Sequence, residues 1–244
     1  MHAFRYDALE QASAGDAVTL EKGESTHLFK ILRAVPGDVC RLLDGKGNSA
    51  LATVGEGKTL LIGKVEKIPP LPGKEMHLFL APPRRQKMDL ILKQCTELGV
   101  ADITPIVCER SVALPDADSV NGRWNELLFE ACKQSGNPYL PQVHSPLKFE
   151  ESLQEACRRS LLCFYGSVSK EEEDPFAGEE AFSGIGWFVG PEGGFTPEEE
   201  SKMRESAFRP LHMNCWILRA ETAAICGLAV LREGFLRRKT LPEA

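Results

Sequence analysis

The first 70 residues carry short apolar stretches separated by residues that favour turns. Alternating apolar and polar positions predict four short strands, over 17–20, 39–43, 49–54 and 59–65. The glycine-bearing segments 44–48 and 55–58 suit hairpin turns between these strands. The pattern predicts a small β-barrel, interrupted by one short helix near 25–32.

A proline-rich segment, Ile68-Pro69-Pro70-Leu71-Pro72-Gly73, follows this region. It cannot continue a strand ladder or a helix, because proline lacks an amide hydrogen and has a fixed φ. From Met76 onward, apolar strands alternate with helical segments, as in α/β domains. The sequence therefore predicts two domains, residues 1–70 and 75–244, joined by a linker.

The second region shows two kinds of periodicity. Continuous apolar runs predict strands over 76–81, 103–107, 161–165, 187–189 and 211–213. Helical spacing predicts helices over 88–98, 123–135, 150–159 and 220–236. Pro105 predicts an edge or bent strand, and Thr196, Pro197 and Glu199 predict a helix start with a capping box.

Composition limits the class of protein. The chain is 43% hydrophobic and 26% charged, as globular proteins are. It has no run of about 20 apolar residues and no apolar signal core near Met1, so a cytoplasmic location and no membrane partner are expected. The eight cysteines form no close pairs; Cys95, Cys132, Cys163 and Cys226 lie in apolar segments and are expected to be buried thiols, and neither a metal site nor a disulfide framework is expected.

The formal net charge of −6 argues against nonspecific coating of nucleic acid, so any RNA contact must be local. Three basic clusters are candidates: Arg84-Arg85-Gln86-Lys87, the pair Arg33 and Arg41, and Arg237-Arg238-Lys239. Taken alone, each cluster is more often a solvated surface than a binding patch.

The segment Gly190-Pro191-Glu192-Gly193-Gly194-Phe195 lies between a predicted strand and the capped helix. Glycines let the main chain approach a ligand and present free N–H groups to it, although a simple tight turn is the alternative. Neither a phosphate loop nor the dinucleotide glycine pattern is present. A second cluster places Arg219 and Glu221 at a helix start, either at a cavity mouth or as a surface pair.

Two segments resemble the signature pair of the RsmE family. The first is 190–195, and the second is Ile217-Leu218-Arg219-Ala220-Glu221-Thr222-Ala223. Members of that family are small-subunit ribosomal RNA methyltransferases of the SPOUT superfamily, which modify a uridine at N3. The resemblance covers almost the whole chain, since 27–33, 44–47, 96–100, 109–111 and 130–136 also match in order.

The resemblance implies a PUA-like RNA-binding β-barrel followed by an α/β SPOUT domain with a mainly parallel sheet and a deep trefoil knot. It implies S-adenosylmethionine as cofactor, 16S ribosomal RNA as partner, within the small subunit, and a homodimer, for which Ala223 and Gly227 would permit close helix approach. The cofactor-binding residues that it implies come from three loops: Phe164, Tyr165, Gly166, Val189, Gly190, Glu192, Gly193, Gly194, Met213, Ile217 and Leu218.

Methylation at N3 requires removal of a proton and stabilisation of the resulting anion. Arg219 is predicted to hold the anion or the uracil oxygens, because guanidinium stays protonated. Glu192 or Glu221 either accepts the proton or orients Arg219, and the sequence leaves both roles open. Arg33, Arg84, Arg85 and Lys87 are predicted to bind RNA.

The chain departs from the family pattern at Met213-Asn214-Cys215-Trp216, at Asn137 and at Lys93-Gln94-Cys95. Two other function classes are therefore considered. One is a noncatalytic RNA-binding or ribosome-assembly protein with the knotted fold, and binding of S-adenosylmethionine would separate it from the enzyme. The other is a small-molecule α/β enzyme with a β-barrel appendage, but no nucleophile–base triad or phosphate loop supports it.

Overall fold

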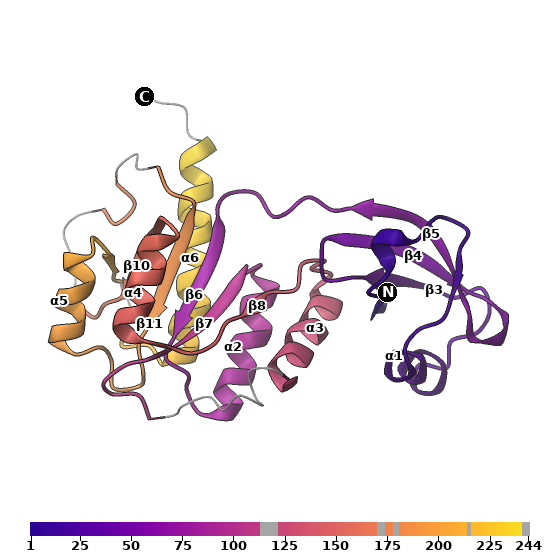
Figure 1. Cartoon of the computed structure of the whole chain (residues 1–244), viewed down its shortest axis with the longest axis horizontal. Helices are drawn as coiled ribbons and strands as arrows, with labels where there is room; N and C mark the ends of the chain where they lie inside the picture. The colour runs from indigo at the N-terminus through magenta and orange to yellow at the C-terminus, as the bar shows by residue number, and fades with distance from the viewer. Residues whose placement is uncertain (113–121, 170–173, 178–180, 214–215, 241–244) are drawn as a thin grey trace. The chain divides into compact units, whose positions relative to one another are not determined.

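A computed structural model describes residues 1–112, 122–169, 174–177, 181–213 and 216–240 (Figure 1). The chain divides into two compact units, one formed by 1–71 with 128–140 and one formed by 72–127 with 141–244. Among the described residues, no helix is both long and apolar enough to cross a membrane.

The first unit contains a sheet with the strand order β1-β3-β4-β5-β2. Its elements are β1 (Ala3–Arg5), η1 (Leu9–Gln11), β2 (Ala17–Val18), α1 (Lys22–Thr26), η2 (His27–Ile31), β3 (Val39–Leu43), β4 (Asn48–Val54), η3 (Glu56–Lys58) and β5 (Leu60–Lys67). β4 pairs antiparallel with β3 and β5, as expected for hairpins. Phe4, Leu42 and Leu60 are buried in its core. The predicted strands are confirmed, and the predicted helix begins at Lys22 instead of near residue 25.

Residues 128–140 belong to this unit through main-chain and side-chain contacts. The amide of Gly47 donates to the carbonyl of Pro138 at 2.8 Å, and the amide of Leu140 donates to the carbonyl of Gly45 at 2.8 Å. Lys133 Nζ lies 2.7 Å from Glu24 Oε1. Such long-range pairings have no local sequence signature, so sequence periodicity alone could not have assigned these residues to the first unit.

The second unit is an α/β sheet with the strand order β12-β10-β11-β6-β7-β8, and β9 also pairs with β7. Its elements are β6 (Glu75–Leu80), α2 (Arg85–Glu97), β7 (Asp102–Val107), α3 (Trp124–Ser135, which continues into the first unit), β8 (Gln142–Val143), β9 (Leu147–Lys148), α4 (Phe149–Arg158), β10 (Leu161–Gly166), β11 (Gly184–Val189), α5 (Pro197–Glu205), β12 (Arg209–Leu211) and α6 (Ala220–Thr240). All the pairings recorded between these strands are parallel, so the predicted α/β class with a parallel sheet is confirmed.

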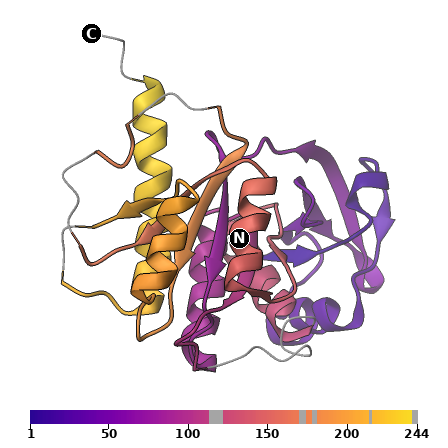
Figure 2. The same ribbon diagram turned by 60° about the vertical axis from the view of Figure 1, so that its left-hand side comes forward.

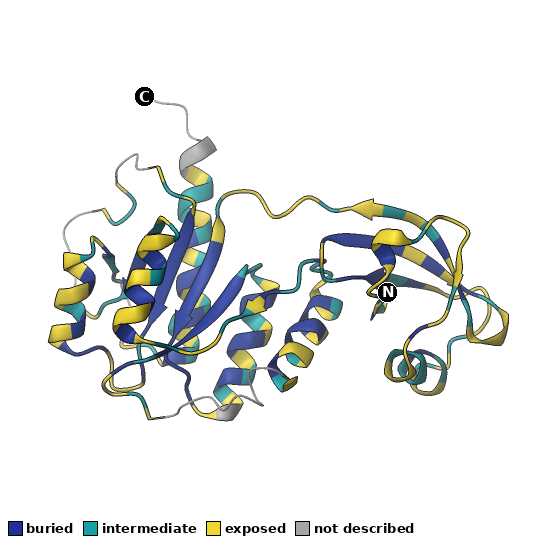
Figure 3. Ribbon diagram, in the orientation of Figure 1, coloured by how far each residue is buried: buried dark blue, intermediate teal, exposed yellow. Residues whose placement is uncertain are grey.

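Helices cover both faces of the parallel sheet, with α4 and α5 on one face and α2 and α6 on the other (Figures 1 and 2). The central strands are buried along their length (Figure 3), because successive side chains point to opposite, covered faces. On the α4 face, the rings of Phe79 and Phe188 stack at 4.3 Å. On the α6 face, Trp187 Nε1 donates to the carbonyl of Ala223 at 3.2 Å.

Three expectations need correction. Pro105 lies in an interior strand, where it is tolerated because β7 pairs with β8 at 102–103 and with β9 at 106–107, which leaves a break between them. Cys226 is exposed, whereas Cys95, Cys132 and Cys163 are buried. The strand predicted at 211–213 is β12, which ends at Leu211.

Gly227 also has a role that the sequence did not reveal. A Cβ atom there would lie 2.2 Å from Trp187 Cε2, so the glycine lets α6 pack against this chain's own sheet.

Candidate active site at the carboxyl edge of the parallel sheet

Four neighbouring strands end at the same edge of the sheet. β12, β10, β11 and β6 are adjacent and parallel, so their carboxyl ends lie side by side. Ligands of open α/β sheets bind at this kind of edge. The three predicted cofactor loops leave β10, β11 and β12, and the structure therefore brings them to one edge. Asn214 and Cys215, in the third loop, lie outside the described residues.

The loop after β11 is held by the residues around it. Gly194 has a φ of 71°, a conformation that glycine adopts readily, and its amide donates to the carbonyl of Pro191 at 2.8 Å. Arg110 Nη1 donates to the carbonyl of Gly193 at 2.9 Å. The main chain of residues 190–194 is thus fixed by contacts that come from both ends of the loop and from the segment after β7.

The helix that follows this loop begins as the sequence predicts. Thr196 Oγ1 accepts from the amide of Glu199 at 3.2 Å, and Glu199 Oε2 accepts from the amide of Thr196 at 2.9 Å. The predicted capping box with Pro197 in the first turn is therefore confirmed. Glu199 Oε1 also accepts from the amide of Glu109 at 2.9 Å, which joins the segments after β7 and β11.

Lys87 joins the two candidate carboxylates. Its Nζ lies 2.9 Å from Glu192 Oε1 and 3.7 Å from Glu221 Oε2. These three side chains come from the first turn of α2, the loop after β11 and the first turn of α6. The structure brings them together although they are far apart in the sequence.

The sequence predicted that Lys87 binds RNA and that Glu192 or Glu221 accepts the proton or orients Arg219. It did not predict the contacts of Lys87 with both glutamates. The sequence alone could not predict the Lys87 contacts, because they depend on the strand order. β6 and β11 are adjacent, and this places α2 beside the loop after β11.

Arg219 lies just before α6, and its side chain is exposed. Its carbonyl accepts from the amide of Ala223 at 2.8 Å, which fixes the backbone at the helix start. A guanidinium in this position is accessible to a ligand at the strand ends, and it is two residues from Glu221. The predicted catalytic residues Arg219, Glu221 and Glu192 therefore all lie at this edge.

The predicted cofactor-binding residues fall into two groups. Phe164, Tyr165 and Val189 have exposed fractions of 0%, 0% and 4%, so their side chains belong to the core and only their main-chain atoms could contact a cofactor. The others have accessible surface: Gly166, Gly190, Glu192, Gly193, Gly194, Met213, Ile217 and Leu218.

The accessible groups fit S-adenosylmethionine in their chemistry. The side chain of Ile217 is 85% exposed, and it offers an apolar surface of the kind that an adenine ring covers. Glu221 Oε2 is buried and accepts no hydrogen bond within the described residues. Gly194 has open space where a Cβ atom would stand.

The predicted RNA-binding residues do not share one element. Arg84 is exposed directly before α2, and Lys87 lies in the first turn of that helix. The side chain of Arg85 lies outside the described part of the chain. Arg33 is an exposed residue of the first unit with a φ of 56°.

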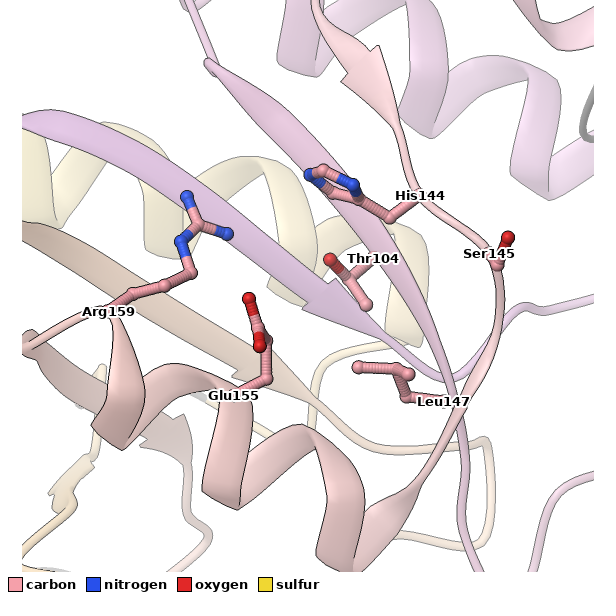
Figure 4. A pocket seen from close by; sticks show the side chains of 6 residues that line it. All are labelled: Thr104, His144, Ser145, Leu147, Glu155 and Arg159. Carbon is pink, nitrogen blue, oxygen red and sulfur yellow. The ribbon is translucent and has the colours of Figure 1, made fainter.

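A separate pocket of about 280 Å³ lies against α4 (Figure 4) and includes none of the predicted site residues. Its lining residues are Thr104, His144, Ser145, Leu147, Glu155 and Arg159. Arg159 Nη2 is 2.8 Å from Asp102 Oδ2, and His77 Nδ1 is 2.9 Å from the same oxygen. Burial alone would raise the pKa of Asp102, but its contacts with His144, His77 and Arg159 outweigh burial and hold that pKa well below its usual range. The pocket borders a structural charge cluster.

Comparison with known proteins gives matches over both parts of the chain. Residues 69–232 match the family described as RNA methyltransferase domain, and residues 20–66 match the family described as RNA methyltransferase PUA domain.

Several individual relatives have the same name. Ribosomal RNA small subunit methyltransferase E of Synechocystis is 30% identical over 87% of this chain and 71% of that protein. The Aquifex aeolicus protein of the same name is 28% identical over 95% of this chain and 99% of that protein. A crystal structure of the Neisseria gonorrhoeae protein of this name, bound to S-adenosyl methionine, is 28% identical, with a TM-score of 0.84 and coverage of 96% of this chain and 98% of that chain.

Proposed function

This chain belongs to the RNA methyltransferase family, and we propose that it transfers the methyl group of S-adenosylmethionine to N3 of a uridine in 16S ribosomal RNA. The observation that carries the proposal is the meeting of Glu192, Glu221 and Lys87 at the strand ends, within the residues 69–232 that match the RNA methyltransferase domain.

We further propose how the chain is organised for this reaction. Residues 1–70 serve as the PUA-like RNA-binding domain, and residues 75–244 serve as the methyltransferase domain. The substrate is ribosomal RNA within the small subunit, the protein acts in the cytoplasm, and two copies form a homodimer. A deep trefoil knot in the second domain remains a prediction.

When bound, S-adenosylmethionine would supply an electrophilic methyl group on a sulfonium. The residues of the chain then have three tasks. The main chain of 190–194 and the apolar side chains of Ile217 and Leu218 hold and orient the cofactor. Arg219 donates to the uracil oxygens and stabilises negative charge on the ring. Glu192 or Glu221 accepts the proton that leaves N3.

The proposed role of Arg219 predicts that Arg219→Ala separates binding from chemistry. Because the guanidinium stabilises the anion formed during the reaction, methylation should fall by about 100-fold or more, whereas the Kd for S-adenosylmethionine in calorimetry should stay within a few-fold. Equal loss of binding and turnover would contradict the role given to Arg219.

The function itself is tested in cells that lack this protein. Mass spectrometry of their 16S ribosomal RNA should show the loss of one N3-methyluridine, which returns when the intact gene is restored. If the set of methylated nucleosides is unchanged by the deletion, the proposed reaction is wrong.

A further inference from the structure

Two carboxylates share one ammonium group at the candidate active site, and they are not equivalent. We propose that Glu221 accepts the N3 proton of the substrate, and that Lys87 is a positioning residue that holds Glu192 and sets the place of Glu221. This inference rests on the proposed function and decides between two acceptors that the sequence left open.

Glu192 is the poorer candidate because its charge is already satisfied. Its Oε1 accepts a hydrogen bond from Lys87 Nζ at 2.9 Å, and its side chain is 34% exposed. A proton arriving at this oxygen would have to displace the bond with Lys87, and water can solvate the rest of the group.

Glu221 has the opposite environment. Its side chain is 12% exposed, and within the described residues its Oε2 is buried and accepts no hydrogen bond. The Lys87 ammonium lies 3.7 Å from Oε2, which is too far for a hydrogen bond. An ionised oxygen that is buried and accepts no hydrogen bond is costly in the resting protein. The N3–H group of the substrate would supply the missing donor, and transfer of its proton would neutralise the oxygen.

Lys87 is placed to keep this arrangement ready. It extends from α2, which follows β6, and it reaches across to the loop after β11 and to α6. When Glu221 takes a proton, Glu192 remains as the partner of the Lys87 ammonium, so the cation is never left without a nearby carboxylate. Lys87 thus acts through the glutamates, and it does not need to touch the substrate.

The chemical step balances with these groups. The N3–H bond breaks, its proton forms a bond to Glu221 Oε2, and its electron pair stays on N3. N3 forms a bond to the methyl carbon, and the electron pair of the carbon–sulfur bond leaves with sulfur. Glu221 passes the proton to water before the next turnover, which restores the carboxylate.

The test compares four purified variants of the full chain: Glu221→Gln, Glu192→Gln, Lys87→Met and Lys87→Arg. A matched control, Glu233→Gln, removes a surface glutamate of the same helix, whose Oε1 pairs with Arg237 Nε at 2.6 Å. For each protein, the Kd for S-adenosylmethionine is measured by calorimetry, and kcat on small subunits is measured between pH 6 and pH 10.

Glu221→Gln should lower kcat at neutral pH by about 100-fold or more, the usual worth of a general base, with the Kd for S-adenosylmethionine within a few-fold of the wild type. Its residual kcat should rise tenfold per pH unit, because hydroxide must then remove the proton. Glu192→Gln should change mainly the Kd, with kcat within tenfold of the wild type, and Glu233→Gln should match the wild type.

Lys87→Met should lower kcat more than it changes the Kd for S-adenosylmethionine, because Glu192 and Glu221 lose the cation that positions them. Lys87→Arg should restore part of the lost kcat. A purely structural role for Lys87 would reduce stability without lowering the kcat of the folded protein.

The inference is overturned if Glu221→Gln binds S-adenosylmethionine normally and retains turnover, or if Glu192→Gln shows the hydroxide-dependent profile instead. Failure of the proposed function is a different result, since wild-type protein would then form no N3-methyluridine. If Glu221→Gln does not fold, Lys87→Met decides, and a folded Lys87→Met protein with the kcat of the wild type overturns the inference.

Discussion

Replacing Gly227 by alanine sets two opposing effects against each other in α6. In an open helix, glycine to alanine stabilises by about 1 kcal/mol. At Gly227, however, the new methyl group would lie 2.2 Å from Trp187 Cε2, 2.3 Å from Cζ2 and 2.5 Å from Nε1. Favourable contacts between carbon atoms are about 3.5–4.0 Å long, so the ring and the helix would have to separate by more than about 1 Å.

Neither partner can move easily. Trp187 has an exposed fraction of 0%, and its Nε1 donates to the carbonyl of Ala223 in the same helix. Overpacking a filled core costs about 1–3 kcal/mol, and we expect the upper end of that range or beyond. After the gain in helix propensity, Gly227→Ala should lower the free energy of unfolding by about 2 kcal/mol, which corresponds to a fall in Tm of about 4–8 °C.

Scanning calorimetry measures this change, and two further proteins isolate its cause. Gly23→Ala, in α1 with nothing within 4 Å of the new Cβ, is a matched control that should be neutral or slightly stabilising. In a Trp187→Phe background the smaller ring should leave room, so that Gly227→Ala costs less. An equal cost in both backgrounds would refute the packing argument. A wild-type Tm together with loss of the dimer would instead favour the subunit contact expected from the sequence.

Three further outcomes are expected. Arg84→Ala and Arg85→Ala should each weaken RNA binding and lower the slope of log K against log salt by about 0.7–0.9, and an unchanged slope would remove them from the interface. Asp102→Asn should lower the free energy of unfolding, measured with urea at neutral pH, by about 3–5 kcal/mol. Because the folded state lowers the pKa of Asp102, the carboxylate stabilises the fold above about pH 4, and this contribution is lost on acidification. The difference in unfolding free energy between the variant and the wild type must therefore become smaller at acidic pH. Thr196→Ala should lower the free energy of unfolding by about 1 kcal/mol through loss of the helix cap. A change smaller than the error of urea unfolding would argue against the capping bonds.

Local signals in the sequence predicted much of this fold. The capping box at Thr196 and Glu199 depends only on neighbouring residues, so the sequence predicted it directly. The α/β class followed from the change in periodicity after Met76, and the family motifs at 190–195 and 217–223 identified the site region.

What the sequence could not supply was pairing across the sheet. The meeting of Lys87 with Glu192 and Glu221 depends on strand order, so the residue type alone suggested a phosphate contact. For the same reason Pro105 was expected at an edge or a bend, because the sequence does not show that β8 and β9 pair with β7 on either side of a break. Phe164 and Tyr165 were expected to line the site because motif position does not reveal which way a side chain points.

Arg110 gives the glycine loop a dependence that matters for protein engineering. Its guanidinium binds the carbonyl of Gly193, and a Cβ atom on that glycine would lie 3.3 Å from Arg110 Cδ. A designer who transplants residues 190–195 into another scaffold would therefore carry over an unsupported peptide. The transferable unit is the loop together with Arg110 and the Glu199 carboxylate, two side chains that no motif search on the loop would include.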